Sequence, residues 1–291
     1  MFSILLINGL IIGSIYGLIA LGYSLIYKAS GLMSFVQGDM ITFGAYMGLT
    51  FYRVMGLPFV ASLLLTFVCA FILGIILERG IIRVLLNKNV IAIYIVLATI
   101  AISFIIQNTA QATYGSVTQW FPQIFQRSTL TIFGVTAQTE AYVCFAVSVV
   151  LMFALHIFMT KTKFGTAMRA SAMDPLAAEA CGINSSLSTG VTWGVAAGIA
   201  SIAGMLLGPM YGVFTMLGAT LGRKGFAGAV IGGYGNMYGA MLGGMILGLV
   251  ETFTAGYWSG TYKNFIAYAI LLLVLFIKPT GIFNERAIQD V

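Results

Sequence analysis

The sequence predicts an all-α polytopic membrane protein, a single transmembrane domain over residues 1–291 with about eight to ten crossings. Three observations support this fold class. Hydrophobic residues make up 60% of the 291 residues, only 8% are charged, and the mean hydropathy is +1.01. Because a soluble domain carries about 25% charged residues, this chain has too little polar surface for a water-soluble enzyme or a nucleic-acid-binding protein.

Apolar runs follow one another along the whole chain, and a helix needs about 20 residues to cross the hydrocarbon. The first run, residues 2–27, is too long for the apolar part of a signal peptide, so we expect a retained span. Glycine interrupts several of the later runs, which leaves the number of crossings open. The later runs cover residues 40–52, 57–77, 90–106, 142–159, 187–207, 210–221, 226–253 and 265–277.

The basic residues predict the orientation, because cytoplasmic loops carry an excess of Lys and Arg. The connections 78–89 and 160–186 are basic, whereas 108–139 contains Arg127 as its one basic residue. We therefore expect 108–139 to be an extracytoplasmic loop, 160–186 to be cytoplasmic, the N-terminus to lie outside and the C-terminus to lie in the cytoplasm. The basic residues of the two inner connections and the tail are Arg79, Arg83, Lys88, Lys161, Lys163, Arg169, Lys278 and Arg286.

Two further features belong to the outer side. Residues 128–137 read as two short strands about Gly134, because β-prone residues flank the glycine. Tyr257, Trp258 and Tyr262 form an expected aromatic belt at the outer membrane surface.

Two segments far apart in the chain share the glycine spacing G-x5-G-A-x2-G, at residues 38–48 and 233–243. Paired glycine-interrupted segments in two halves indicate an internal repeat and a central substrate path. Non-helical backbone at membrane depth is tolerated where it is buried in protein or lines a cavity. Chance is the alternative, since 35 of the 291 residues are glycine.

Two carboxylates, Asp39 and Glu251, fall inside apolar segments. A carboxylate within the membrane is costly and is therefore a functional candidate by default. A structural role is the alternative for each. Asp39 suits the N-cap of a helix that begins at Met40, and Glu251 suits a hydrogen bond between helices.

No motif for catalysis or metal binding is present. His156 is the single histidine, and Cys69, Cys144 and Cys181 are far apart, so neither a multi-histidine metal centre nor a disulfide framework is expected. The sequence contains no G-x-S-x-G, H-E-x-x-H or Walker A motif. We expect no enzyme activity, metal or cofactor in this chain, and any ATP hydrolysis must belong to another subunit.

The cytoplasmic segment 160–186 is rich in alanine and favours helix. Asp174 and Pro175 are typical of the N-cap and first position of a helix, and Gly182 is typical of its end. We expect two short helices at residues 166–173 and 175–181. Their small and apolar side chains suit a groove on a cytosolic partner; an interfacial connector is the alternative.

This segment resembles the coupling loop of ABC importer permeases, through G-x3-R-A-x3-D from Gly165 to Asp174 and the later Gly182-Ile183. The whole chain is similar to the H-type permease subunit of branched-chain amino acid ABC transporters. The other similar motifs, in family order, are F-x2-G-acid with a later G-A-Y at 35–46, the run 224–235 ending in G-G-x-G, and K-P-T-G at 278–281. The family typically has His and Gly-Glu in the first motif, where this chain has Gln37-Gly38-Asp39.

The resemblance implies two sets of functional residues. The ATPase-coupling loop contains Gly165, Arg169, Ala170, Asp174, Glu179, Gly182 and Ile183. The second set is a substrate path, which the resemblance suggests together with the glycine breaks and the two carboxylates. Its residues are Ser34, Phe35, Gln37, Gly38, Asp39, Gly233, Gly235 and Glu251.

The resemblance also implies partners and a location. The partners are a second permease chain or a copy of this one, two cytosolic ATPase subunits that hold ATP and Mg²⁺, and a periplasmic binding protein. The location is the inner membrane of a bacterium, and the substrates are leucine, isoleucine and valine. The alternatives are a permease for urea, short amides or another small polar solute, and an ion-coupled transporter in which Asp39 and Glu251 carry protons.

Overall fold

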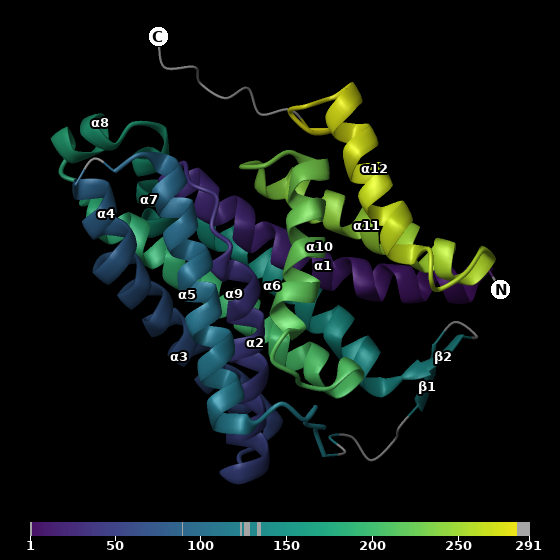
Figure 1. Ribbon diagram of the computed structural model, residues 1–291. Coiled ribbons are helices and arrows are strands. Elements are labelled where there is room, and N and C mark those ends of the chain that lie inside the picture. The colour runs from purple at the N-terminus through teal and green to yellow at the C-terminus, as the bar shows by residue number, and fades with distance from the viewer. Residues whose placement is uncertain (1, 89, 123, 125–128, 133–134, 284–291) are drawn as a thin grey trace.

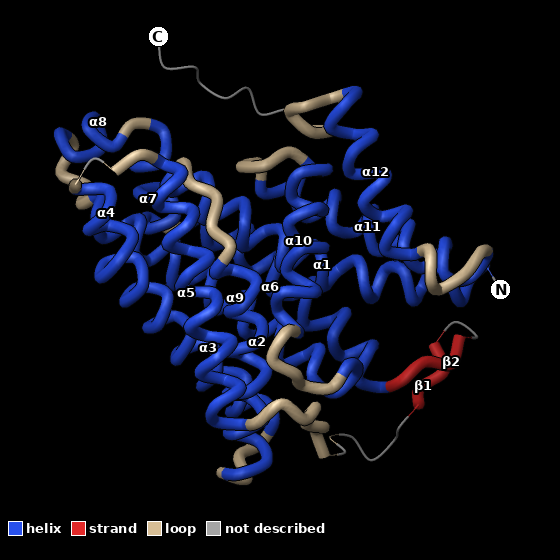
Figure 2. The backbone as a smooth tube through the Cα atoms, in the orientation of Figure 1, coloured by secondary structure: helices blue, strands red, loops and turns tan. Residues whose placement is uncertain are grey.

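The computed structural model describes residues 2–88, 90–122, 124, 129–132 and 135–283, and it shows a helical protein with one short hairpin (Figures 1 and 2). The helices are α1 Phe2–Ser30, α2 Val36–Leu49, α3 Phe59–Leu77, α4 Arg83–Asn87, α5 Ala92–Tyr114, α6 Thr139–Lys161, α7 Lys163–Met173, α8 Pro175–Ala180, α9 Ser185–Tyr211, α10 Leu217–Gly232, α11 Met237–Tyr257 and α12 Lys263–Ile277. The π-helical turns are η1 Thr50–Val54 and η2 Glu78–Ile82, and the strands are β1 Thr129–Ile132 and β2 Val135–Gln138.

Among the described residues, six helices are long and apolar enough to cross a membrane, which makes this a multi-pass membrane protein. They are α1, α5, α6, α9, α11 and the continuous helix Phe59–Asn87. The helices α2, α10 and α12 have 14, 16 and 15 residues. The expected eight to ten crossings are reached only when these three are added to the six, which gives nine.

Two expected boundaries are wrong. The connection 78–89 is helical as far as Asn87, because α3 continues through η2 into α4. There Glu78 is buried and pairs with Arg83 at 2.5 Å. The segment predicted as an extracytoplasmic loop, 108–139, begins later than expected, because α5 runs to Tyr114.

The predicted hairpin is confirmed by the antiparallel pairing of β1 with β2. Three aromatic residues predicted as a belt are exposed: Tyr257 at the end of α11, and Trp258 and Tyr262 between α11 and α12. Arg127, Gly134 and Arg286 lie outside the described residues.

The interior is built around α1 and α9, whose central segments are almost fully buried. Glycine allows close packing on both helices, as is usual in membranes. On α1, a Cβ atom added at Gly13 would lie 2.9 Å from the Met245 Cα of α11, and one added at Gly17 would meet Met241. Gly194 of α9 faces the Phe71 ring of α3 in the same manner.

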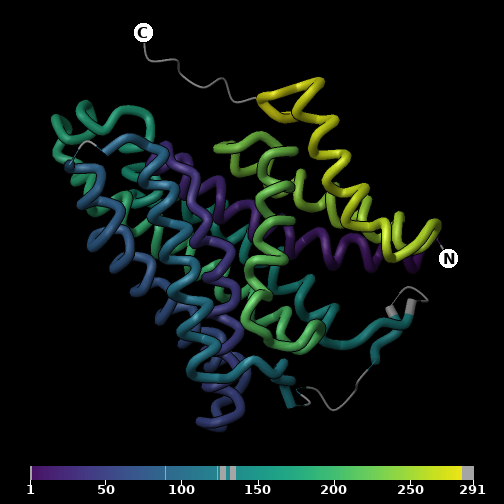
Figure 3. The backbone as a smooth tube through the Cα atoms, in the orientation of Figure 1, coloured from purple at the N-terminus to yellow at the C-terminus, as the bar shows by residue number. Residues whose placement is uncertain are grey.

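The chain contains an internal repeat that relates α1–α3 to α9–α11. In both halves a long helix, a five-residue gap (31–35 and 212–216), a short helix, a four-residue gap (55–58 and 233–236) and another long helix follow in order. α1 packs antiparallel to α11, and α9 packs antiparallel to α3; Figure 3 shows the purple α1 beside the yellow-green α11.

The two halves run in opposite directions, because the equivalent helices α2 and α10 cross antiparallel. Gly38 lies against Gly218 and Gly222 at this crossing, and the Gly218 amide donates to the Thr42 hydroxyl at 2.8 Å. An inverted repeat of this kind is typical of transport proteins with a central path.

The glycine register predicted for the repeat is wrong. It matched residues 38–48 with 233–243, but the structure makes α2 equivalent to α10 rather than to the start of α11. Gly38 lies inside α2, whereas Gly233 follows α10 with φ at +114°. The shared spacing therefore reflects similar close packing on different elements, and not equivalent positions.

Candidate functional site

The first candidate site is the start of α2, after the break at residues 31–35. α2 begins at Val36, so Asp39 lies in its first turn and is not the N-cap that the sequence suggested. The Asp39 side chain is buried and faces α5. Its carboxylate accepts hydrogen bonds from the Ser103 hydroxyl and, at 2.9 Å, from Gln107 Nε2. Within the part of the chain that the structure describes, the side-chain donors to this buried carboxylate are therefore neutral.

Two buried polar atoms beside Asp39 lack a protein partner within the described residues: Ser34 Oγ and Gln37 Oε1. The other end of the Gln37 amide donates from Nε2 to the Ala196 carbonyl of α9 at 2.9 Å. A buried polar atom without a protein partner is costly unless water or a ligand satisfies it. The start of α2 therefore offers free hydrogen-bonding atoms, as a binding surface would.

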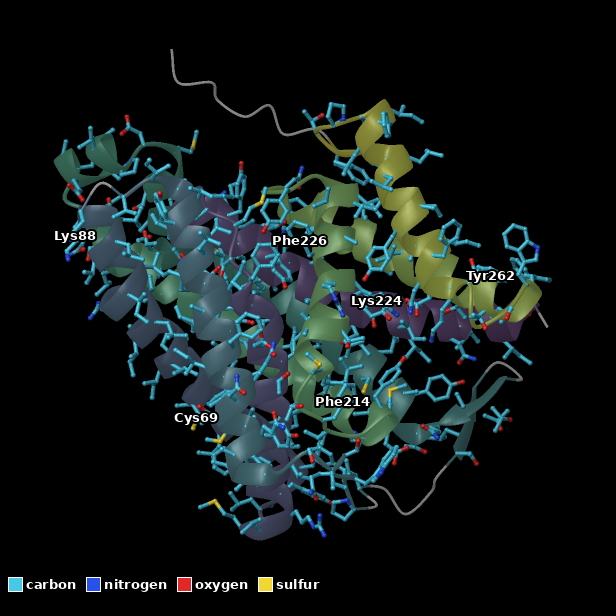
Figure 4. The ribbon with its side chains drawn as sticks, in the orientation of Figure 1. Cys69, Lys88, Phe214, Lys224, Phe226 and Tyr262 are labelled. Atoms are coloured by element: carbon cyan, nitrogen blue, oxygen red, sulfur yellow. The ribbon has the colours of Figure 1, made fainter. Side chains whose placement is uncertain are left out.

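Aromatic rings connect the break at 31–35 with the turn at 233–236. The Phe226 ring of α10 lies 6.0 Å from Phe35, 5.7 Å from Tyr23 and 5.5 Å from Tyr234, measured between centroids. The ring centroids of Tyr27 and Tyr234 lie 4.7 Å apart. Burial raises the pKa of Tyr234 above its ordinary value. These rings form an aromatic cluster beside the first candidate site, and Phe226 is labelled in Figure 4.

The turn itself needs its two predicted glycines. Gly233 and Gly235 have φ of +114° and +97°, a region that residues with a Cβ atom rarely adopt. The Gly235 amide donates to Ser24 Oγ at 3.4 Å, which holds the turn against the end of α1. The structure thus brings both glycines and Phe35 to one region.

Glu251 is part of a different group, the second candidate site. Lys224 Nζ lies 2.6 Å from Glu251 Oε1, and the Tyr16 hydroxyl donates to Oε2 at 3.0 Å. Lys224 also donates to the Tyr16 hydroxyl at 3.2 Å, and Lys263 Nζ lies 3.7 Å from Oε1. Figure 4 shows Lys224 on α10, where its side chain points toward α1. The predicted contact between helices is confirmed, but it is an ion pair.

Sequence reasoning missed Lys224, although the signal was present. The residue lies in an apolar helix, as Asp39 and Glu251 do, but it was read only as the start of the 224–235 motif. Its side chain is buried between Tyr16 and Glu251. A charged residue within an apolar helix was itself sufficient reason to look for a partner.

The predicted coupling loop forms two helices at nearly the predicted positions, α7 and α8. Asp174 caps α8, because its Oδ1 accepts the Ala177 amide at 3.0 Å. Gly182 has φ of +81° after this helix, and the Ile183 amide donates to the Ala178 carbonyl at 2.9 Å.

Some of the predicted loop residues shape the loop from within. Gly165 is buried where α7 crosses Phe158 and Met159 of α6, and no Cβ atom fits there. Arg169 is half-buried in a small cavity that Leu25 of α1 also lines. Ala170 is half-buried as well, so these three residues position the helices.

The exposed surface of the loop has the apolar character that the sequence predicted, but its two largest apolar side chains were not among the predicted residues. Met173 and Leu176 are 72% and 80% exposed, on either side of Asp174 and Pro175. Glu179 and Gly182 are exposed as well. We call this surface, from Met173 to Gly182, the α7–α8 surface. The signal in the sequence was that Met173 and Leu176 flank the capping pair Asp174 and Pro175. Large apolar side chains exposed together are typical of an interaction surface.

Comparison with known proteins agrees with this architecture. The model of the family described as branched-chain amino acid transport system / permease component matches residues 5–275. The chain is 33% identical to the high-affinity branched-chain amino acid transport system permease protein LivH of Salmonella typhimurium, over 98% of this chain and 96% of the relative. No solved structure matches.

Two further relatives come from distant organisms. The chain is 33% identical to the high-affinity branched-chain amino acid transport system permease protein BraD of Pseudomonas aeruginosa, over 98% of this chain and 97% of the relative. It is 29% identical to a probable branched-chain amino acid transport permease protein LivH of Methanocaldococcus jannaschii, over 96% and 92%. The similarity spans all the membrane helices, and the chain belongs to the family of branched-chain amino acid transport system permease components.

Proposed function

We propose that this chain is the permease subunit of an ATP-driven ABC importer and forms the transmembrane path for leucine, isoleucine and valine. The observation that carries the proposal is similarity over nearly the full length to permeases named for high-affinity branched-chain amino acid transport. The inverted repeat supports it, because two oppositely directed halves around a central crossing suit a path that opens to alternate sides.

In this proposal the path passes the start of α2. Ser34, Phe35, Gln37, Gly38 and Asp39 line it together with the turn at Gly233 and Gly235. The unpartnered oxygens of Ser34 and Gln37 offer hydrogen bonds to a passing polar group. Weak contacts of this kind favour release, which a transport path requires.

The α7–α8 surface is the docking site for a cytosolic ATPase subunit. Its two large exposed apolar residues, Met173 and Leu176, would fill a groove on that partner, and Asp174 and Glu179 would border the contact with charge. The complete importer contains two ATPase subunits that hold ATP and Mg²⁺, a second permease chain and a periplasmic binding protein. It lies in the inner membrane, with the N-terminus of this chain outside and the C-terminus in the cytoplasm.

Uptake by the purified complex in proteoliposomes tests the proposal. We expect accumulation of radiolabelled leucine, isoleucine and valine that requires the binding protein outside and ATP in the compartment of the ATPase subunits. Excess urea or acetamide should not compete. Uptake that a pH gradient drives without any ATPase subunit would refute the importer and support an ion-coupled carrier. ATP-dependent uptake of urea alone would keep the importer and refute the substrate.

Leu176→Asp tests the docking surface separately. A buried aspartate in an apolar contact is costly, so we expect the ATPase subunit to be lost from the purified complex and uptake to fall at least tenfold. Val117→Asp is the matched control, since Val117 is 71% exposed in the 115–121 segment after α5. ATPase retention by the Leu176 variant, with uptake unchanged, would contradict this docking surface.

A further inference from the structure

A cavity of about 260 Å³ lies beside Glu251, away from the start of α2. Its walls are largely apolar and include Ile11 and Ile12 of α1, Met210 of α9 and Ala255 of α11. Glu251 and Lys263 are its charged lining residues, and Asn8, Tyr211 and Thr252 add neutral polar groups. The volume is below the roughly 300–1,000 Å³ of pockets for drug-sized ligands, so the cavity suits a small metabolite.

Among the described residues, the charges at Glu251 are not balanced. Glu251 carries one negative charge, while Lys224 and Lys263 carry two positive charges beside it. Lys224 is held by Glu251 and the Tyr16 hydroxyl and is buried. The Lys263 side chain is 40% exposed and is more distant, at 3.7 Å from Glu251. Lys263 can therefore turn to another anion at little cost, whereas Lys224 keeps the Glu251 carboxylate in place.

We propose that this cavity binds a zwitterionic α-amino acid with a branched aliphatic side chain, an inference that rests on the proposed function for its substrate class. The α-ammonium group contacts Glu251, and the α-carboxylate contacts Lys263. The side chain packs against Ile11, Ile12 and Met210. A zwitterion needs an anion and a cation close together, and the spare positive charge complements its carboxylate.

The position of the cavity suits the arrival of substrate. It lies at the start of α1, α6 and α12 and at the end of α9 and α11. The exposed aromatic belt between α11 and α12 and the strand before α6 are on this side. This is the side predicted to face the binding protein, so the cavity would receive an amino acid before it reaches the path.

Two variants of the full complex test the site without breaking the buried ion pair. Lys263→Gln removes the exposed cation, and Ala255→Leu fills the apolar part of the cavity. The matched controls are Lys278→Gln, at the other end of α12, and Ala112→Leu, an exposed alanine of α5. Binding is measured by saturation-transfer NMR without the binding protein, with leucine, leucinol and 4-methylpentanoate, and the KM for leucine uptake is measured with it.

We expect Lys263→Gln to weaken leucine binding about tenfold and to raise the KM, because a charge-assisted hydrogen bond is lost. Leucinol, which has no carboxylate, should bind the wild type weakly and should not respond to Lys263→Gln. 4-Methylpentanoate, which has no ammonium group, should bind weakly as well. Ala255→Leu should abolish the leucine signal, and both controls should match the wild type.

Other outcomes would overturn the site. If both cavity variants bind and transport leucine as the wild type does, the site is refuted while the proposed function stands. The same holds if Lys263→Gln releases a co-purified phospholipid and leaves leucine binding unchanged, because the cavity is then a lipid site. Absence of leucine uptake by the wild-type complex would instead refute the proposed function.

Discussion

The two buried carboxylates of this protein are stabilised in different ways. Asp39 at the start of α2 accepts hydrogen bonds from Ser103 and Gln107, both neutral, whereas Glu251 on α11 pairs with Lys224 and Lys263. A charge held by neutral donors can be removed with little disturbance of its surroundings. A charge that is paired with a buried countercharge cannot be removed in this way, because the countercharge would then be buried without a partner. The comparison separates a site that suits passing contacts from one that also joins four helices, α1, α10, α11 and α12.

The largest expected effect is on the ion pair. Lys224→Met leaves Glu251 with the Tyr16 hydroxyl and the partly exposed Lys263, and breaking a buried pair costs about 3–5 kcal/mol. We expect a large loss of stability in detergent, measured by SDS unfolding followed by circular dichroism. The double variant Lys224→Met with Glu251→Met should recover most of the loss. If the double variant is no more stable than the single one, the pair is not the cause.

A smaller effect is expected where the two halves cross. A Cβ atom at Gly218 would meet the Gly38 carbonyl and the Thr42 hydroxyl at distances that no structure tolerates. Gly218→Ala should therefore cost about 1–3 kcal/mol through overpacking. Gly80→Ala is the control, because Gly80 is exposed with open space around it, and alanine there should leave stability unchanged or raise it slightly. Equal stability of the two variants would contradict the tight crossing.

Neutralising the other carboxylate should cost less than either change. Asp39→Asn keeps an oxygen for Ser103, and the amide can adapt to Gln107, so we expect a loss of about 1 kcal/mol in the same unfolding assay. Leucine uptake should fall about tenfold, since the charge of the proposed path is removed. A loss of 3 kcal/mol or more would show that Asp39 is as structural as Glu251 and would remove the contrast between them.

The smallest effect is expected at Lys263. Its side chain is 40% exposed and lies 3.7 Å from Glu251, and exposed ion pairs contribute about 0–1 kcal/mol. Lys263→Gln should change the SDS midpoint by no more than the Lys278→Gln control does. A large loss of stability would mean that Glu251 needs both lysines, and Lys263 would then not be free to bind a ligand.

Much of the fold follows from local patterns in the sequence. The spans at 2–27 and 187–207 lie within α1 and α9, and the span at 57–77 begins two residues before α3 and ends with it. The match is close because the length of an apolar run alone decides whether a helix can cross a bilayer. The ends of α8 are equally local. Asp174 caps the helix and Gly182 takes the positive φ after it, and each effect acts within one turn of the helix.

The partners of the candidate residues could not be read in the same way. Tyr16 donates to Glu251 across 235 positions of the chain, and Gln107 donates to Asp39 across 68. Hydropathy says that a carboxylate is buried, but not which neutral or charged group stabilises it. The register of the repeat failed for a similar reason, since glycine spacing marks close packing and does not name the helix that is packed against.

The sequence by itself therefore determined the class of the protein, most of its helices and the capped loop between α6 and α9. Tertiary structure alone decided that α2 is the counterpart of α10, that Lys224 and Glu251 form a pair, and that Met173 and Leu176, and not Arg169, face outward. The physical reason is the separation along the chain over which each effect acts. Helix length and capping depend on residues a few positions apart, whereas burial and ion pairing depend on how helices distant in the chain pack together.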